Sequence, residues 1–280
     1  MNCAWKAYLN LLPVGLRSPV EKIGNETLTE VRLRCGQRPE LVTDNGSIRL
    51  NTLVTREDLK FTVNIASQYS AWSSGTAAYG YITAAGGHRI GLCGQAVTDQ
   101  KGMSGIREPT SLCIRLAKDV EGFAGPAAHL QGSILIIGRP GCGKTTFLRD
   151  LIRQKSLEQH VAVADERQEL FPISAGTYCF DTGIGTDILS GCRKAEGVLM
   201  LIRCMNPNYV AVDEITEQAD CVSLLQAGWC GVSLLATAHA GSKEELYSRP
   251  VYKPLLEKKL FDHLVILHPD RSFRIERMSL

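Results

Sequence analysis

The segment Gly138–Thr146, which reads GRPGCGKTT, constrains the fold of this 280-residue chain more than any other feature. It fits the pattern G-x-x-x-x-G-K-[ST], follows the apolar run Ile134–Ile137 and opens the helix-like stretch Lys144–Gln154. Glycines let the backbone curl so that successive N–H groups point inward, in conformations that a Cβ atom would obstruct. The following helix adds the positive end of its dipole. Inward N–H groups beside a lysine suit a phosphate chain, so the segment predicts a nucleotide site.

The chemistry of this loop predicts ATP and Mg²⁺ as its ligands. Lys144 is expected to reach the β- and γ-phosphates, and the Thr145 hydroxyl to ligate the metal ion. Cys142 lies inside the loop and is a candidate for an oxidation-sensitive thiol. The predicted nucleotide-binding residues are Gly138, Arg139, Pro140, Gly141, Cys142, Gly143, Lys144, Thr145 and Thr146.

A phosphate loop also needs an acid to hold the metal and a group to orient the attacking water. The apolar run Tyr209–Val212 ends in Asp213 and Glu214. A parallel strand would deliver both acids to the carboxyl edge of the sheet, beside the phosphate loop. We therefore assign Asp213 to Mg²⁺, directly or through water, and Glu214 to polarising the nucleophilic water. The competing interpretation is a strand followed by an ordinary acidic turn.

Two more apolar runs end in polar side chains. Val161–Ala164 leads into Asp165-Glu166-Arg167, where either acid is a candidate to assist the metal and the arginine to pair with an acid or a phosphate. Leu234–Ala240 carries Thr237 and His239, and an imidazole there is suited to sensing the γ-phosphate. On residue pattern alone, a solvated acidic strand end and a structural histidine remain open as alternatives.

The predicted fold class is α/β: a RecA-like P-loop NTPase domain (124–280) with a smaller N-terminal α+β domain (1–123). The first half mixes short alternating strands with glycine turns; its predicted elements are strands at Glu30–Arg34 and Leu112–Leu116, a hairpin turn at Asp44–Gly46, a helix at Arg56–Ser70, and two strands within Tyr79–Val97 joined across Gly86-Gly87. The Gly- and Ala-rich stretch Gly122–Gly132 predicts a linker or a short helix.

The second half alternates near-continuous apolar strands with helices, which indicates a parallel sheet covered on both faces. Beyond the runs already described, the predicted elements are a strand at His160–Ala164, a helix at Ala219–Gly228, and strands at Val232–Ala236, Leu264–Leu267 and Phe273–Ile275.

Bulk composition restricts the class of protein. The chain has 31 basic and 29 acidic residues, a balance that does not favour a nucleic-acid partner. No apolar run approaches the roughly 18–20 residues that cross a bilayer, and the N-terminus lacks the pattern of a signal peptide. We therefore expect a cytoplasmic protein without an integral membrane segment. The 10 cysteines form no C-x-x-C pair, which favours buried free thiols over a zinc site.

The order of these motifs resembles the type II/type IV secretion ATPase superfamily, where they are called the Walker A, Asp box, Walker B and His box. The resemblance is carried by GRPGCGKTT, the DER strand end, LIRCMNPNYVAVDEI and GVSLLATAHA. It implies that Glu166 takes the Asp-box role and His239 the His-box role, so that both join Glu214 as catalytic residues. One departure is Asp213, where secretion ATPases commonly have glycine.

Ring assembly is a further implication of this resemblance. Secretion ATPases work as ring oligomers, and a hexamer is implied by that analogy alone. An arginine supplied in trans is expected in such rings to stabilise transition-state charge. Arg203 matches an arginine of the superfamily, and Arg89, Arg107 and Arg115 are candidates for the trans role, with surface ion pairing as the alternative.

The first half narrows the resemblance to the stage III sporulation protein AA family. The matching segments are EVRLRCGQRPELV, GYITAAGGHRIGLCGQAV, GIREPTSLCIRLAKDVEGFA and RPVYKPLLEKKLFDHLVIL. This resemblance spans nearly the whole chain. It implies an ATPase of endospore-forming bacteria that works from the mother-cell cytoplasm. Its implied partners are membrane-embedded sporulation channel proteins, which it would energise from a peripheral position on that channel complex between mother cell and forespore.

Two other functions stay open. A RecA-like core also drives nucleic-acid motors, which would show as ATPase activity stimulated by DNA and lost with added salt. Alternatively, the chain is a nucleotide-gated assembly factor in which binding, not turnover, matters. Glu214→Gln would then retain biological function whereas Lys144→Ala would lose it.

Overall fold

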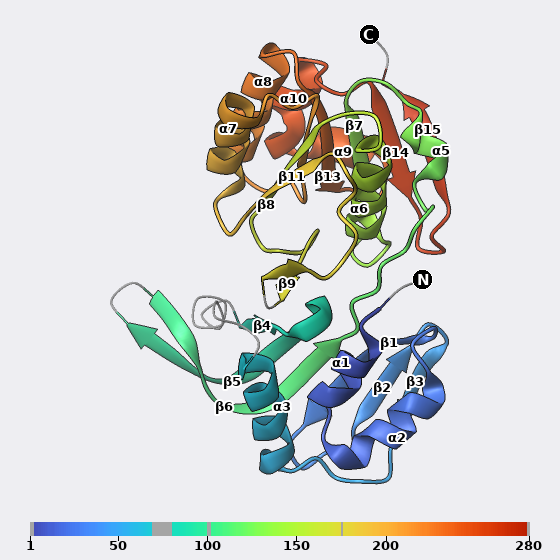
Figure 1. The fold of residues 1–280 in the computed structure, drawn as a ribbon, viewed down its shortest axis with the longest axis vertical. Helices are drawn as coiled ribbons and strands as arrows, with labels where there is room; N and C mark the ends of the chain where they lie inside the picture. Colours follow the sequence, from blue (N-terminus) through green and yellow to red (C-terminus); the bar gives the residue numbers. More distant parts are fainter. Residues whose placement is uncertain (1–2, 69–79, 100–101, 175, 279–280) are drawn as a thin grey trace. The chain divides into compact units, whose positions relative to one another are not determined.

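The chain forms two units in the computed structural model, which describes residues 3–68, 80–99, 102–174 and 176–278 (Figure 1). Unit 1 comprises Met1–Asp119 and Pro172–Phe180, and unit 2 comprises Val120–Phe171 and Asp181–Leu280. Across the described residues, no helix has both the length and the hydrophobicity to span a bilayer.

The segment 172–180 is the main difference between these units and the predicted domains, 1–123 and 124–280. It is predicted in the second domain and belongs to unit 1. Its strands β9 (Ile173–Ser174) and β10 (Thr177–Tyr178) pair as a hairpin. A Cβ atom on Gly87 would lie 3.0 Å from the Pro172 ring. Such packing joins residues distant in sequence, so local patterns did not predict it.

Unit 1 is built on an antiparallel sheet in which the strand order is β3-β2-β1-β6-β5-β4. In Figure 1 the α-helices of this unit lie against one face of the sheet. The described elements, besides β9 and β10, are α1 (Trp5–Leu11), α2 (Val14–Ile23), β1 (Leu28–Arg34), β2 (Glu40–Thr43), β3 (Gly46–Arg49), α3 (Arg56–Gln68), β4 (Tyr81–Thr83), the 3-10 turn η2 (Ala85–Gly87), β5 (Arg89–Asp99) and β6 (Gly102–Arg115).

The α+β character predicted for this half is therefore confirmed. The predicted strand at Glu30–Arg34 lies within β1, the turn at Asp44–Gly46 joins β2 to β3, and Gly86-Gly87 separates β4 from β5. The end of the predicted helix Arg56–Ser70 and the start of Tyr79–Val97 lie outside the described residues. Apolar alternation was sufficient for β1, where Val31 and Leu33 are buried and Arg32 between them is only partly buried.

His88 links distant parts of unit 1 through a fully buried imidazole. Its Nδ1 accepts a hydrogen bond from the Ala117 N–H at 3.1 Å, so Nε2 carries the proton and donates it to the Ala4 carbonyl at 3.0 Å. Burial lowers the pKa of His88 to about 4. The ring is thus neutral at physiological pH and holds the N-terminal segment beside the end of the sheet.

Acidification is expected to destabilise unit 1 through His88. The pKa of His88 is about 4 in the folded state, below the ordinary value of 6.5, so the unfolded state binds the proton first. Stability that is fully present above pH 6.5 is lost as the pH falls toward 4. This pKa difference is worth roughly 3 kcal/mol.

Urea denaturation of the wild type and His88→Gln at pH 7.5 and 4.5 measures this effect. The variant should be less stable at pH 7.5, and the gap should narrow by about 2–3 kcal/mol at pH 4.5 because glutamine does not titrate. An equal gap at both pH values would contradict the assignment.

Unit 2 is built on a sheet with the strand order β11-β8-β12-β13-β7-β14-β15, in which only the pairing of β15 is antiparallel among the described strands. Its described elements are α5 (Gly125–Ala128), β7 (Ile134–Gly138), α6 (Lys144–Lys155), β8 (Val161–Asp165), β11 (Thr186–Ser190), α7 (Lys194–Met205), β12 (Tyr209–Val212), α8 (Gln218–Trp229), β13 (Ser233–His239), α9 (Lys243–Ser248), η3 (Pro250–Tyr252), α10 (Lys253–Glu257), β14 (His263–Leu267) and β15 (Phe273–Arg277).

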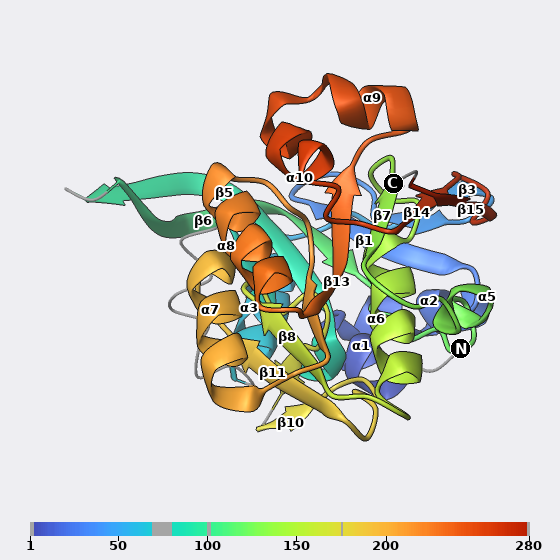
Figure 2. The same cartoon turned by 90° about the horizontal axis from the view of Figure 1, so that it is seen from above.

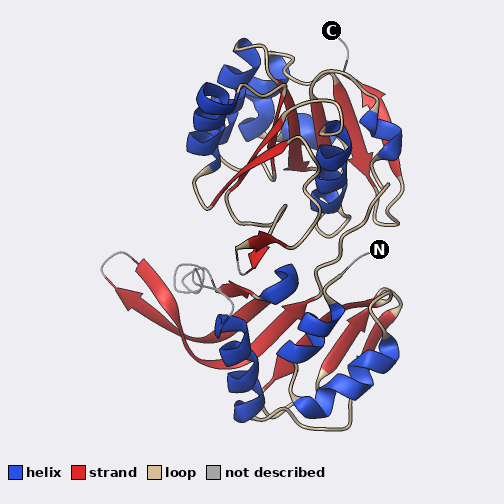
Figure 3. Cartoon of the chain, in the orientation of Figure 1, coloured by secondary structure: helices blue, strands red, loops and turns tan. Residues whose placement is uncertain are grey.

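Helices cover both faces of this sheet, as the continuous apolar strands predict. Figure 2 shows α7 and α8 on one side of β8 and β13 and α6 on the other, and Figure 3 separates the helices from the strands by colour. The residues of β7, β8 and β12 are all buried. Because these strands are parallel, their carboxyl ends lie at one edge of the sheet. The predicted α/β fold of the second half is confirmed.

The helix α6 holds both ends of the segment Val120–Phe171, where the chain first enters and first leaves unit 2. The Asp150 carboxylate accepts hydrogen bonds from the N–H groups of Gly122 at 3.1 Å and Ala124 at 2.7 Å. Arg149 Nε donates to the Leu170 carbonyl at 2.5 Å. Both charged side chains are buried. A single helix that begins in the glycine motif therefore anchors two of the three points at which the chain passes from one unit to the other.

Candidate nucleotide site

The bend between β7 and α6 has the backbone geometry that the glycine motif predicts. Gly143, directly before α6, has a left-handed φ of +98°, which an L side chain rarely adopts. A Cβ atom on Gly138 would lie 2.3 Å from the buried Cys142 sulfur. The exposed tip of the loop consists of Arg139, Pro140 and Gly141. The thiol of Cys142 thus packs inward while the tip stays open to solvent.

Lys144 is 7% exposed, and its ammonium group lies at the base of this loop. Its Nζ donates to the carbonyls of Gly138 at 3.0 Å and Arg139 at 3.2 Å, and lies 3.0 Å from His239 Nδ1. Burial lowers the pKa of Lys144, while the nearby Asp213 carboxylate acts in the opposite direction. The cation is therefore held by neutral acceptors, which an anionic phosphate oxygen would outcompete.

Asp213 joins α6 to β12 and β13 through two hydroxyl groups. Its carboxylate accepts hydrogen bonds from Thr145 Oγ1 at 2.8 Å and from Thr237 Oγ1 at 2.6 Å. Burial raises the pKa of Asp213, while the two threonine hydrogen bonds act to lower it. Both donors are neutral, so a cation beside this carboxylate would offset the cost of its burial.

Glu214 has a left-handed backbone with φ of +51°, a conformation that costs a non-glycine residue of order 1–3 kcal/mol. Its N–H donates to Thr237 Oγ1 at 2.7 Å, and its Oε1 lies 3.1 Å from His239 Nε2. With Nδ1 accepting from Lys144, Nε2 is the nitrogen that donates to Glu214. The imidazole thus bridges the loop lysine and the glutamate.

The two acids at the end of β8 have different environments. The Asp165 carboxylate is 1% exposed and accepts hydrogen bonds from the N–H groups of Glu169 at 2.9 Å and Phe171 at 2.8 Å. Burial raises its pKa to about 6. The Glu166 side chain is 37% exposed, and its Oε2 lies 3.9 Å from Lys194 Nζ. Asp165 therefore organises the loop that follows, whereas Glu166 is the more exposed acid of this pair and accepts a hydrogen bond from the Lys194 N–H at 3.5 Å.

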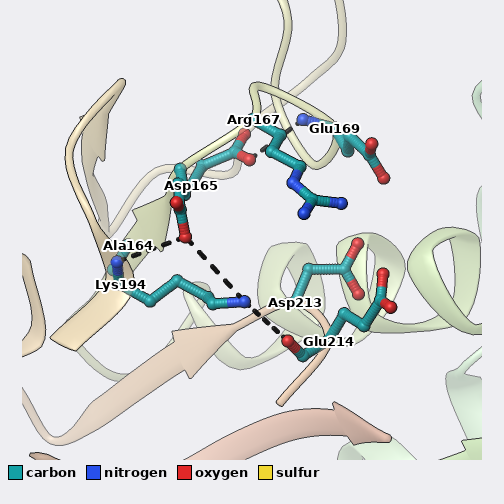
Figure 4. Close-up of a pocket in the computed structure, with 8 residues that line it drawn as sticks. Ala164, Asp165, Arg167, Glu169, Lys194, Asp213 and Glu214 are labelled. Carbon is teal, nitrogen blue, oxygen red and sulfur yellow. Dashed lines mark hydrogen bonds and ion pairs between the residues drawn. The ribbon is translucent and has the colours of Figure 1, made fainter. Parts of the chain in front are cut away.

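These strand ends line a common pocket (Figure 4), formed by Ala164, Asp165, Glu166, Arg167, Glu169, Lys194, Asp213 and Glu214. Sequence reasoning identified the acids at both strand ends but missed Lys194 and Glu169. One signal for Lys194 was present: it opens the helix after β11, and such a helix begins at the carboxyl edge of the parallel sheet.

The residues present fit a magnesium nucleotide. Thr145 and Asp213 supply the hard oxygen ligands that Mg²⁺ prefers, and a phosphate chain fits the open glycine bend. Among the described residues, no three His, Cys, Asp or Glu side chains gather as a ready metal cage. In nucleotide sites Mg²⁺ is typically bound by one or two protein carboxylates together with substrate phosphates.

Two of the arginines considered for a role in trans, Arg89 and Arg115, have partners in unit 1. The Arg89 guanidinium lies over the Tyr81 ring, 3.9 Å from its centroid, and Arg115 Nε lies 3.6 Å from Glu30 Oε2. The Arg115 contact agrees with the surface ion pairing that the sequence left open, whereas Arg89 contacts an aromatic ring. The source of an arginine in trans stays a prediction.

The fold of the chain is that of RecA-like secretion ATPases. The pilus retraction motor PilT, solved with bound ADP, matches with a TM-score of 0.62 and 13% identity, covering 95% of this chain and 83% of that one. The ATPase DotB of Legionella pneumophila matches with a TM-score of 0.55 and 15% identity, covering 95% and 80%. At such low identity the likeness establishes the fold.

Within that class, residues 6–274 match the family described as "Sporulation stage III, protein AA", and the chain belongs to this family. Stage III sporulation protein AA of Bacillus subtilis (strain 168) is 35% identical over 272 residues, which cover 92% of this chain and 89% of that protein. Protein SEEDLING PLASTID DEVELOPMENT 1 of Arabidopsis thaliana is 25% identical over 261 residues, which cover 89% of this chain and 36% of that protein. The family resemblance expected from sequence is confirmed.

Proposed function

We propose that this chain is a magnesium-dependent ATPase of the secretion-motor type that energises a sporulation channel complex. The observation that carries the proposal is the convergence of Lys144 and Thr145 with Asp213, Glu214 and His239 at one edge of the unit 2 sheet. A lysine, a hydroxyl, a metal-binding acid and a second acid beside a glycine bend are the parts that phosphoryl transfer to water requires.

Each residue of this group has a defined task in the proposed reaction. The amides of the loop and Lys144 bind the phosphate chain, and Mg²⁺ supplies charge neutralisation for the phosphates when bound by Thr145 and Asp213. Glu214 orients the attacking water and accepts hydrogen bonding from it. His239, in contact with both Lys144 and Glu214, is suited to report the presence of the terminal phosphate to the glutamate. Glu166 assists from the end of β8.

The proposed partners follow from the family and the fold. Membership in a sporulation stage III family supports a role in the mother-cell cytoplasm, on a membrane-embedded channel complex between mother cell and forespore. The likeness to PilT, described as a pilus retraction motor, supports the conversion of ATP hydrolysis into movement. We propose a ring oligomer, with a hexamer as the form expected by analogy, and no nucleic-acid substrate.

Phosphate release by the purified chain tests this function. We expect slow ATP hydrolysis that requires Mg²⁺, stops on addition of EDTA and is unchanged by single- or double-stranded DNA. Stimulation by DNA that disappears steeply with added salt would support a nucleic-acid motor instead. Hydrolysis is measured on folded protein used directly and on protein first assembled with a non-hydrolysable analogue. No ATP hydrolysis in either case would contradict the proposal.

A further inference from the structure

Lys194 is a buried charge in the pocket that the proposed function does not use. It is the first residue of α7, and its side chain is 9% exposed. Its Nζ donates to the Glu214 backbone carbonyl at 2.6 Å and lies 3.5 Å from Asp220 Oδ2. Figure 4 shows its side chain reaching toward Glu214, between the strand end with Asp165 and the one with Asp213.

A lysine in this position must be compensated by oxygen atoms, because burying an ammonium group is costly unless it is paired. Four oxygens surround it. Besides the two just given, Thr216 Oγ1 lies at 3.4 Å and Glu166 Oε2 at 3.9 Å. The short contact is to the backbone of Glu214, whereas the carboxylates lie farther away. The ammonium group is therefore directed at a peptide group next to the proposed water-orienting acid.

The peptide that Lys194 holds is the strained one. Glu214 has φ of +51°, a rotation that glutamate rarely adopts. Its N–H is fixed by Thr237 Oγ1 on one side and its carbonyl by Lys194 Nζ on the other. With both peptide groups fixed, the side chain leaves the backbone in the direction of His239. Loss of either contact would let the backbone relax and turn the carboxylate away.

Building on the proposed ATPase function, we infer that Lys194 is a positioning residue for Glu214. It holds the Glu214 carbonyl, and through it the direction of the carboxylate, and it places Glu166 on the same side of the pocket. Lys194 touches the reacting groups only through these two acids. Its removal should therefore lower the rate of turnover and leave the affinity for nucleotide almost unchanged.

A purely structural role is the competing explanation, because Asp220 also belongs to the capping box that begins α8. A structural lysine would lower the melting temperature on removal without separating kcat from nucleotide affinity. Lys155 provides the matched control. It is another buried lysine of unit 2, it donates to the Leu130 carbonyl, and it lies over the Tyr209 ring. It is not among the residues that line the pocket.

The test compares Lys194→Met, Lys194→Arg and Lys155→Met with the wild type. We expect Lys194→Met to lower kcat by about 30-fold or more. The same variant should change the Kd for a magnesium-bound non-hydrolysable ATP analogue by less than about threefold. Lys194→Arg should recover part of the lost kcat. Lys155→Met should keep kcat. Should Lys194→Met not fold, Lys194→Gln, which keeps a donor but no charge, replaces it with the same expected outcomes.

Amide hydrogen exchange on the nucleotide-free protein supplies a readout that does not depend on activity. Exchange in residues 214–217 should be faster by about tenfold in Lys194→Met and unchanged in Lys155→Met. Unchanged exchange there, or equal losses of kcat in both methionine variants, would overturn the inference. If the wild type shows no ATPase activity, the proposed function fails, and the exchange experiment still decides whether Lys194 holds the Glu214 peptide.

Discussion

Lys144→Ala is expected to lose nucleotide binding and to lower ATP turnover by about 10³-fold or more. The Lys144 ammonium group lies at the base of the glycine bend and is held by two carbonyls and an imidazole. Those neutral acceptors compensate its charge less well than a triphosphate would. Removal of the Lys144 side chain should therefore destabilise the nucleotide complex far more than it destabilises the free protein.

The control for this variant is Lys155→Ala, on the same helix. Lys155 is the last residue of α6 and is also buried, at 5% exposure. Its ammonium group donates a hydrogen bond to the Leu130 carbonyl. We expect Lys155→Ala to lower the melting temperature and to keep nucleotide affinity and kcat per folded molecule. Phosphate release and equilibrium binding, measured on both variants, separate the two effects. Equal turnover by Lys144→Ala and the wild type would show that the site assignment is wrong.

Glu214→Gln is expected to bind nucleotide as the wild type does and to lower kcat by about 10²–10⁴-fold. The substitution keeps the shape of the side chain and removes its capacity to polarise water. The contacts that hold the Glu214 backbone, from its N–H to Thr237 and from Lys194 to its carbonyl, do not involve the carboxylate. The fold around the site should therefore be unchanged.

This variant also distinguishes turnover from gating. Single-turnover and steady-state phosphate release measure the loss of turnover in Glu214→Gln. The matched control is Glu196→Gln, which changes an exposed acid on α7. An assembly factor that needs only nucleotide binding would keep its sporulation function in Glu214→Gln and lose it in Lys144→Ala. Loss in both variants supports turnover. A Glu214→Gln protein with wild-type kcat would remove Glu214 from the proposed mechanism.

Much of the nucleotide site could be predicted because its parts are local in sequence. The glycine bend is one continuous segment, and Asp213, Glu214 and His239 each follow an apolar run. Parallel pairing of β12 with β13, and of β13 with β7, then brings those run ends together. To place these residues together it was enough to know that the strands are parallel, because parallel strands present their carboxyl ends at one edge of the sheet.

Other parts depend on packing that no local pattern records. The helix α7 was not predicted, and Gly197 in its first turn lowers its intrinsic helix propensity. The structure shows why glycine is there: an added Cβ atom would lie 2.9 Å from the Cys192 sulfur and 3.2 Å from Ala164, so the helix lies close against β8. Missing α7 meant missing Lys194 as well.

The two acids after β8 illustrate a second limit. The residue pattern alone left open which of Asp165 and Glu166 would serve the site, because adjacent residues at a strand end look alike, and only the family resemblance assigned the role to Glu166. Hydrogen bonds from the N–H groups of Glu169 and Phe171 hold the Asp165 carboxylate, and the loop that makes them leads directly into the segment 172–180 of unit 1. The direction of the Asp165 carboxylate was thus set by a loop whose path was not predictable.

Isothermal titration calorimetry of a non-hydrolysable ATP analogue with Mg²⁺ is the most direct test of the central claim, that the amides of Gly138–Thr146 enclose a triphosphate. The wild type should bind one nucleotide per chain with a Kd between about 1 μM and 1 mM, and Lys144→Ala should release no measurable heat. An absence of heat with folded wild-type protein, or equal heats for the two proteins, would contradict the account.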